Sequence, residues 1–130
     1  MRPSSLLICL GIWLPSCVSE LEFGNYRCGN GVTVRDYNIR MAFVAAQRRI
    51  SGLSANEHQV LQDLLYTGVL ARSANEALYQ WEVDVPDSSG SSNYRYKYKI
   101  TFNVSYEIRW IIYYRENGNT FTEVDCCTRL

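Results

Sequence analysis

The residues best suited to chemistry in this sequence lie in the stretch NYRYKYKITFNVSY, which runs from Asn93 to Tyr106. Cationic and polar side chains alternate there with aromatic and aliphatic ones, as in a β-strand. Cations bind phosphate groups and aromatic rings stack on nucleobases, so the pattern suits an RNA-binding surface. The alternative is a solvated strand face whose lysines discourage edge pairing. We favour the solvated face, because the chain has 13 basic and 13 acidic residues, whereas a strong polyanion binder carries a basic excess.

Alternation within this stretch assigns its side chains to two faces of a sheet. One face is expected to pack on a helix and form the core; its members are Tyr94, Tyr96, Tyr98, Ile100, Phe102 and Val104. The other face is expected to be open; its members are Arg95, Lys97, Lys99, Thr101, Asn103 and Ser105. The triplet from Asn103 to Ser105 is an N-glycosylation sequon, which we expect to be unused because it lies within a strand.

The apolar stretch at residues 107–116 adds further residues to the candidate surface. Arg109 and Arg115 share a face there with Ile111 and Tyr113. This face is either an exposed patch for protein docking or is covered by the connector at residues 68–77. The candidate RNA or partner surface consists of Arg95, Lys97, Lys99, Arg109, Tyr113 and Arg115.

Acid–base and metal chemistry have little support. The chain has one histidine, His58, and histidine is the side chain that titrates near neutral pH. Its immediate neighbours are polar, so we expect an exposed helix residue rather than a displaced catalytic acid. Histidine and cysteine also lack zinc-ligand spacing, and we expect neither a metal nor a cofactor.

The first residues, MRPSSLLICLGIWLPSCVSE, have the three regions of a secretory signal peptide. An apolar run from Leu6 to Leu14 follows one basic residue and precedes small residues. This run is far shorter than the roughly 20 residues that a membrane span needs. We therefore expect a signal peptide at residues 1–19 and one secreted domain, without a membrane anchor, at residues 20–130.

Removal of the signal peptide leaves a net charge of −1 and three cysteines, Cys28, Cys126 and Cys127. In an oxidising compartment we expect a bridge from Cys28 to one of the C-terminal pair. The chain-entropy model gives about 4–5 kcal/mol for closing a loop of on the order of 100 residues. Both C-terminal partners are open on this reasoning, and one thiol is left over.

Periodicity along the chain predicts an α+β fold. A hairpin turn is expected at residues 29–31, and a main helix is expected to begin with Asp36 as N-cap and to stop at Gly52. The apolar face of this helix comprises Ile39, Phe43, Ala46 and Ile50. A capping box at residues 54–57 opens a short second helix that is expected to end at Gly68, and residues 71–77 form a polar connector.

From Leu78 onward the period changes to two. Strands are expected at residues 78–85, 94–106, 107–116 and 120–126, with turns at residues 87–93 and 116–119. Together they predict an antiparallel sheet with the main helix packed across one face.

The stretch YRCGNGVTVRDYNIRMAFVAAQRRI resembles the opening of small fungal guanyl-specific ribonucleases. A Y-x-C motif, here Tyr26, Arg27 and Cys28, just after a signal peptide also resembles secreted powdery-mildew effectors, the RNase-like proteins associated with haustoria. Their pattern also includes a C-terminal cysteine and a strand similar to LYQW at residues 78–81. The resemblance covers essentially the whole mature chain and implies a ribonuclease-like fold.

The active ribonucleases use a glutamate as base, a histidine as acid and an arginine on the phosphate. The resemblance places the histidine late in the chain, but the segment WIIYYRENGNTFTEVDCC contains none. Tyr114 and Arg115 lie nearest to its place, and neither readily donates a proton at neutral pH. Glu76 and Glu82 both flank the expected place of the glutamate. We therefore expect a non-catalytic member.

The resemblance implies a secreted virulence effector of a plant-pathogenic fungus that acts in the host cell cytoplasm. Its partners would be host plant proteins, including intracellular nucleotide-binding leucine-rich-repeat (NLR) immune receptors that recognise it as an avirulence determinant. Two alternatives are a weak RNA-binding module and an active secreted ribonuclease.

Overall fold

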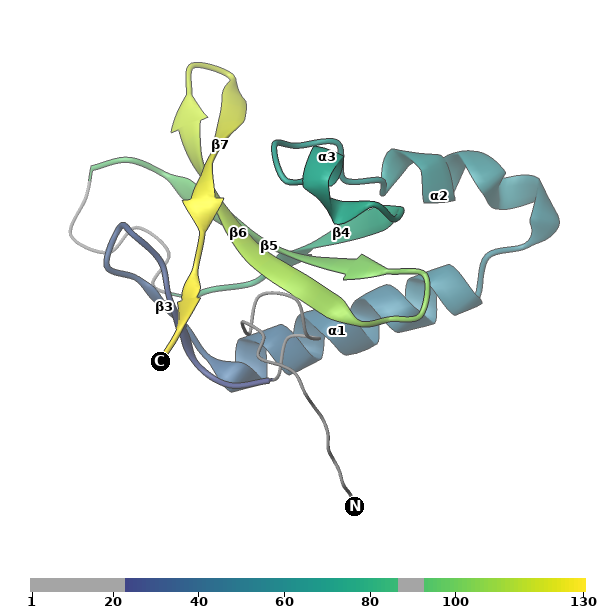
Figure 1. Cartoon of the computed structure of the whole chain (residues 1–130), viewed down its shortest axis with the longest axis horizontal. Helices are drawn as coiled ribbons and strands as arrows, with labels where there is room; N and C mark the ends of the chain where they lie inside the picture. Colours follow the sequence, from purple (N-terminus) through teal and green to yellow (C-terminus); the bar gives the residue numbers. More distant parts are fainter. Residues whose placement is uncertain (1–22, 87–92) are drawn as a thin grey trace.

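The computed structural model describes residues 23–86 and 93–130. The predicted signal peptide and nearly all of the predicted turn at residues 87–93 lie outside the described residues. The fold is α+β, as predicted, with a main helix and antiparallel sheets (Figure 1). Its helical elements are α1 (Asp36–Ser51), the 3-10 helix η3 (Ala55–Glu57), α2 (His58–Asp63) and α3 (Ala71–Ala74). Its strands are β2 (Tyr26–Arg27), β3 (Thr33–Val34), β4 (Leu78–Val83), β5 (Tyr96–Asn103), β6 (Ile108–Asn117), β7 (Thr120–Cys126) and β8 (Thr128–Arg129).

The first and last of the described strands meet in a small sheet of order β3-β2-β8. The predicted hairpin joins β2 and β3, and its turn includes Gly31 with a φ of 89°, a conformation that glycine adopts without strain. Strand β8 pairs with β2 on its other side, so Tyr26 lies opposite Arg129. A disulfide joins Cys28 to Cys127 across 99 positions of sequence. The bridge therefore ties the hairpin to the end of the larger sheet.

Helix α1 presents the predicted apolar face to the sheet. Ile39 and Ala46 of this face are buried, and Phe43 and Ile50 are partly buried against the core, because residues three and four apart lie on one side of a helix. Ala42, which was not predicted, is also buried. The predicted N-cap is wrong: Arg35 occupies that position and Asp36 is the first helical residue. The side-chain oxygen of Asn25 accepts the Asp36 N–H at 2.9 Å, so a residue outside the helix satisfies this donor.

The larger sheet is antiparallel and has the order β4-β5-β6-β7. Its strands follow the predicted segments, and the predicted turn between β6 and β7 includes Gly118 with a φ of 68°. The β5–β6 register shifts after Thr101, which leaves Arg109 as an extra residue in β6. A second shift lies in the β6–β7 pair next to Tyr114.

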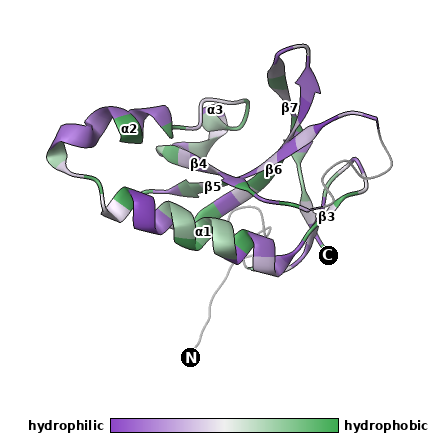
Figure 2. Cartoon of the chain, turned by 180° about the vertical axis from the view of Figure 1, so that it is seen from behind, coloured by the Kyte–Doolittle hydropathy of each residue, from purple (hydrophilic) through white to green (hydrophobic). Residues whose placement is uncertain are grey.

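Helix α1 covers one face of this sheet, which we call the helix face (Tyr98, Ile100, Phe102 and Ile111) (Figure 1). These four side chains are buried, as predicted for the first three. Figure 2 shows polar and apolar segments mixed along α1. Two members of the predicted set are not core: Tyr94 precedes β5 and Val104 follows it, and they are 52% and 67% exposed. The strand is therefore shorter than its alternating sequence.

The opposite face, which we call the lysine face (Gln80, Lys97, Lys99, Thr101 and Tyr114), is only partly open. The prediction of an open face is wrong near the end of β5, because Thr101 and Asn103 are buried. A second apolar cluster covers this part; its buried members are Tyr66, Leu78, Ile112 and Tyr114. The chain after α2 supplies the cover, with helix α3 where a polar connector was expected.

Helix α2 ends earlier than the apolar pattern suggested because the chain turns to pair with β4. The Tyr66 N–H donates to the Leu78 carbonyl and the Gln80 N–H donates to the Leu64 carbonyl, each at 2.8 Å. Leu65 forms a bridge with Tyr79. Backbone pairing therefore takes over from helical hydrogen bonds at this point. The capping box at Ser54 and Glu57 is present as predicted.

Candidate functional site: the lysine face

The basic residues of β5 lie on the lysine face beside carboxylates and aromatic rings. Lys97 Nζ lies 3.9 Å from Glu82 Oε1 and 4.6 Å from the centre of the Phe121 ring. Lys99 Nζ lies 4.9 Å from the centre of the Tyr114 ring. Burial, followed by the charge of Lys97, lowers the pKa of Lys99. Cation–π contacts and a nearby carboxylate thus occupy both ammonium groups.

The arginines of the candidate surface are also engaged. Arg95 pairs with Glu116 at 3.1 Å, and the Arg115 guanidinium lies 4.6 Å from the centre of the Tyr94 ring. Arg109 pairs with Glu76 at 2.7 Å and with Glu107 at 3.3 Å. Carboxylates therefore offset much of the positive charge that phosphate binding would need.

The expectation that Arg109, Ile111 and Tyr113 share an exposed or connector-covered face is wrong. Ile111 and Tyr113 are buried in the core on the helix face. The bulge at Arg109 changes the alternation, and its guanidinium meets Glu76, which also accepts a hydrogen bond from Asn103 at 3.1 Å. The connector covers the opposite face. No docking patch therefore exists at these positions.

The sequon asparagine has a structural role. The Asn103 amide nitrogen donates to Glu76 and, at 2.8 Å, to Glu107, while its oxygen accepts the N–H groups of Ser105 and Glu107. These bonds hold the β5–β6 turn, where Tyr106 has a φ of 62°. A buried amide that is engaged on both sides is a poor acceptor for a glycan.

A phenol–carboxylate pair lies at the covered end of the lysine face. The Tyr66 hydroxyl donates to Glu123 at 2.9 Å and accepts the Leu70 N–H at 3.1 Å. Burial raises the pKa of Tyr66 to about 12 and also raises the pKa of Tyr114. Gly68 allows this approach, because a side chain there would collide with the Tyr66 ring and the Glu123 carboxylate.

Sequence reasoning missed this pair. Tyr66 and Glu123 are 57 positions apart, and neither lies in a motif. The one local sign was Gly68, two residues after Tyr66, because a glycine allows other side chains to approach the backbone closely.

The residues considered for catalysis are not gathered on one surface. His58 is exposed in α2, as predicted, and its ring lies 3.3 Å from the Gln62 amide. Glu82 lies beside Lys97 and Glu76 beside Arg109. Helix α2 and strand β7 lie toward opposite ends of the molecule in both views (Figures 1 and 2). Within residues 23–86 and 93–130, no group of three histidine, cysteine or acidic side chains could hold a metal ion.

The Y-x-C motif belongs to the core. Tyr26 and Cys28 are buried, and Arg27 between them is exposed. Cys127 is the partner of Cys28, which decides between the two predicted partners. Cys126 is a free, half-buried thiol in the second apolar cluster, and burial raises its pKa. None of the described helices is long and apolar enough to cross a membrane.

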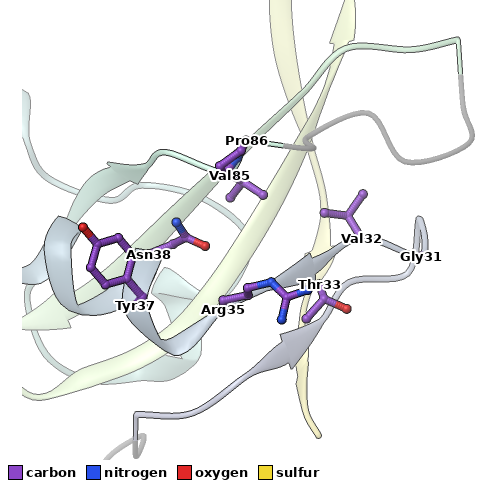
Figure 3. A pocket seen from close by; sticks show the side chains of 8 residues that line it. All are labelled: Gly31, Val32, Thr33, Arg35, Tyr37, Asn38, Val85 and Pro86. Carbon is purple, nitrogen blue, oxygen red and sulfur yellow. The ribbon is translucent and has the colours of Figure 1, made fainter.

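A hollow in the surface lies outside the lysine face, between the hairpin, the start of α1 and the end of β4 (Figure 3). Its volume is about 440 Å³. Arg35 and Thr33 line one side, and Val85 and Pro86 line another (Figure 3).

Comparisons with protein-family models, with curated proteins and with solved structures found no match for this chain. The structure alone therefore shows the fold class. The ribonuclease-like assignment remains a prediction from the sequence motifs.

Proposed function

We propose that this protein is a secreted effector of a plant-pathogenic fungus that acts in host cells by binding host proteins, without catalysis. The observation that carries the non-catalytic part is the position of the chain's single imidazole. His58 lies in α2 beside Gln62, while the carboxylate Glu82 on the lysine face lies beside Lys97. General acid–base cleavage of RNA needs an acid and a base on either side of one phosphate.

The effector part rests on the motifs. A predicted signal peptide, Y-x-C at residues 26–28, an alanine-rich helix and a C-terminal cysteine occur together. A disulfide-closed scaffold with exposed loops suits recognition by surface residues. The proposed partners are host plant proteins, including NLR immune receptors.

Expression in leaf cells tests the effector proposal. The chain without residues 1–19 is produced in leaves of resistant and susceptible plants, and cell death is scored. Death confined to resistant plants is the expected result. A matched Cys28→Ser variant, which loses the bridge, should fail to accumulate or to act. Absence of any response in a broad panel of resistant plants, with the protein detected in the cells, would count against recognition by an NLR.

RNA cleavage tests the non-catalytic part. Purified protein should leave RNA intact between pH 4 and pH 9. Cleavage with a bell-shaped pH profile that disappears in His58→Ala would establish the ribonuclease alternative instead.

Weak RNA binding is a second candidate, because Lys97 and Lys99 share a face with an aromatic ring. A filter-binding titration against salt, with Lys97→Ala plus Lys99→Ala as the paired variant, tests it. Binding that falls steeply with salt and is lost in the variant would support this candidate. Equal retention of RNA by the unaltered protein and the double variant would exclude these lysines as the RNA-binding site.

A further inference from the structure

The outer edge of β4 is paired along only part of its length. Leu78 and Gln80 direct backbone groups outward, where Tyr66 and Leu64 bind them. Backbone groups of alternate residues in an antiparallel strand point to the same side, so Glu82 also directs its N–H and carbonyl outward. No residue within 23–86 or 93–130 pairs with this side of Glu82. The edge therefore offers an unused donor and acceptor.

A groove runs beside this edge. The cavity of Figure 3 adjoins a second cavity of about 330 Å³, and both are lined by Tyr37 and Asn38. Helix α1 forms one wall, with Tyr37 68% and Met41 55% exposed. Trp81 and Val85 contribute the opposite wall. A largely apolar wall thus lies next to unpaired backbone groups.

The exposed charged side chains of β4 and the residues just after it are negative here, whereas Arg35 lines the cavity next to the hairpin. Glu82 and Asp84 are two residues apart and exposed, and both line the second cavity. The ion pair of Glu82 with Lys97 is long, at 3.9 Å. Two copies of this chain joined edge to edge would bring these carboxylates together, and a nucleic acid would bring phosphates to them. Both occupants are disfavoured by like-charge repulsion.

We propose that the outer edge of β4 at Glu82 and Asp84, with the groove beside α1, binds an extended basic segment of a partner protein by strand addition. Such a segment supplies the alternating N–H and carbonyl groups that the edge lacks. Lysines or arginines on its one face lie next to Glu82, and apolar side chains on its other face lie against Trp81 and Met41. This inference rests on the proposed function, since it names the surface on which a protein partner docks.

Two peptides test the chemistry: acetyl-KVKVKVKVK-amide and the matched acetyl-EVEVEVEVE-amide. Each is titrated into full-length mature protein labelled with ¹⁵N. The lysine peptide should shift amide signals of residues 81–85 and 37–45 and slow exchange of the Glu82 amide at least tenfold. The glutamate peptide should bind at least tenfold more weakly. Equal binding of both peptides, shifts confined to other residues, or no binding at millimolar peptide would overturn the proposal.

Glu82→Pro removes the outward N–H and leaves the β5 pairing intact, because proline is tolerated at an edge whose N–H faces solvent. This variant should bind the lysine peptide at least tenfold more weakly. Met41→Arg, at an exposed wall of the groove, gives a second test that does not depend on the fold of the proline variant and should also weaken binding. Glu116→Gln, which likewise removes one negative charge but at a position outside the groove, should not weaken binding. Equal peptide affinity in all three variants would contradict the site.

The leaf assay separates this inference from the proposed function. If the unaltered protein causes cell death and Glu82→Pro does so equally, the effector proposal stands and the edge is not its docking surface. If the unaltered protein is inert, the effector proposal fails whatever the peptides show.

Discussion

The two faces of the four-stranded sheet differ although one strand, β5, supplies both. Tyr98, Ile100 and Phe102 pack on α1 in a buried core, with Phe102 and Phe43 ring centres 6.2 Å apart. On the lysine face, Lys97 and Lys99 lie over aromatic rings. Toward its other end this face closes beneath Tyr66 and its neighbours. Alternation thus separates the residues into two sets, but what covers each set comes from elsewhere in the chain.

The two adjacent C-terminal cysteines show the same difference between the two faces of the sheet. Cys127 belongs to the core on the helix face and is bonded to Cys28, whereas Cys126 belongs to the cluster on the lysine face. The side chains of neighbouring residues in an extended chain point in opposite directions. One of the two cysteines therefore packs in each cluster.

The largest expected effect concerns these cysteines. Replacing Cys28 and Cys127 together by alanine should lower the free energy of unfolding by about 4–5 kcal/mol, because the unfolded chain loses a loop closure of 99 positions. Cys126→Ala should cost no more than about 1 kcal/mol, since its thiol is half-buried and forms no disulfide. Urea unfolding of the oxidised proteins measures both. Similar losses in the two variants would remove the distinction between the faces.

Next in size is the aromatic core. Phe102→Ala should cost about 3–5 kcal/mol, because it empties a fully buried site between α1 and the sheet. The matched change on the lysine face, Lys97→Ala, should cost less than about 0.5 kcal/mol, because its ion pair is long and partly exposed. Denaturant midpoints compare the two. A loss for Lys97→Ala as large as that for Phe102→Ala would show that the lysine face contributes as much as the core.

The Tyr66–Glu123 pair should produce a response to alkaline pH. The folded protein holds the pKa of Tyr66 at about 12, above its usual 10, so this group contributes its full stability below pH 10 and loses it as pH rises toward 12. The unaltered protein should therefore lose roughly 2 kcal/mol relative to Tyr66→Phe between pH 10 and pH 12. Unfolding free energies at stepped pH test this. Parallel pH profiles of the two proteins would contradict it.

The smallest effect is expected at Glu76. Its hydrogen bond with Arg109, and then that with Asn103, lowers its pKa below the usual 4.5. Its stabilisation is therefore present above pH 4.5 and is lost as pH falls through the lower folded value. Glu76→Gln should cost no more than about 1 kcal/mol at pH 7 and nothing in strong acid. A cost that stays constant from pH 7 to pH 2 would mean that the carboxylate charge is irrelevant.

Local signals predicted much of the fold. The i, i+4 spacing of Ile39 and Phe43 and the period-two pattern around Ile100 each describe contacts within one element, where neighbours in sequence are neighbours in space. The hydrogen bond from the Asp36 N–H to Asn25, the early end of α2 at its pairing with β4, and strand β8 were not predicted, because in each the partner comes from another part of the chain.

The sequence by itself determined the class of fold, the separation of β5 into two faces and the presence of a bridge near the chain ends. Only the tertiary structure decided that Cys127 is the partner, that a bulge places Arg109 beside Glu76, and that Tyr66 meets Glu123. The physical reason is the separation in sequence between the residues that make each contact. Periodicity is set by the geometry of a few successive residues, whereas a contact across 57 or 99 positions depends on how all the intervening elements pack.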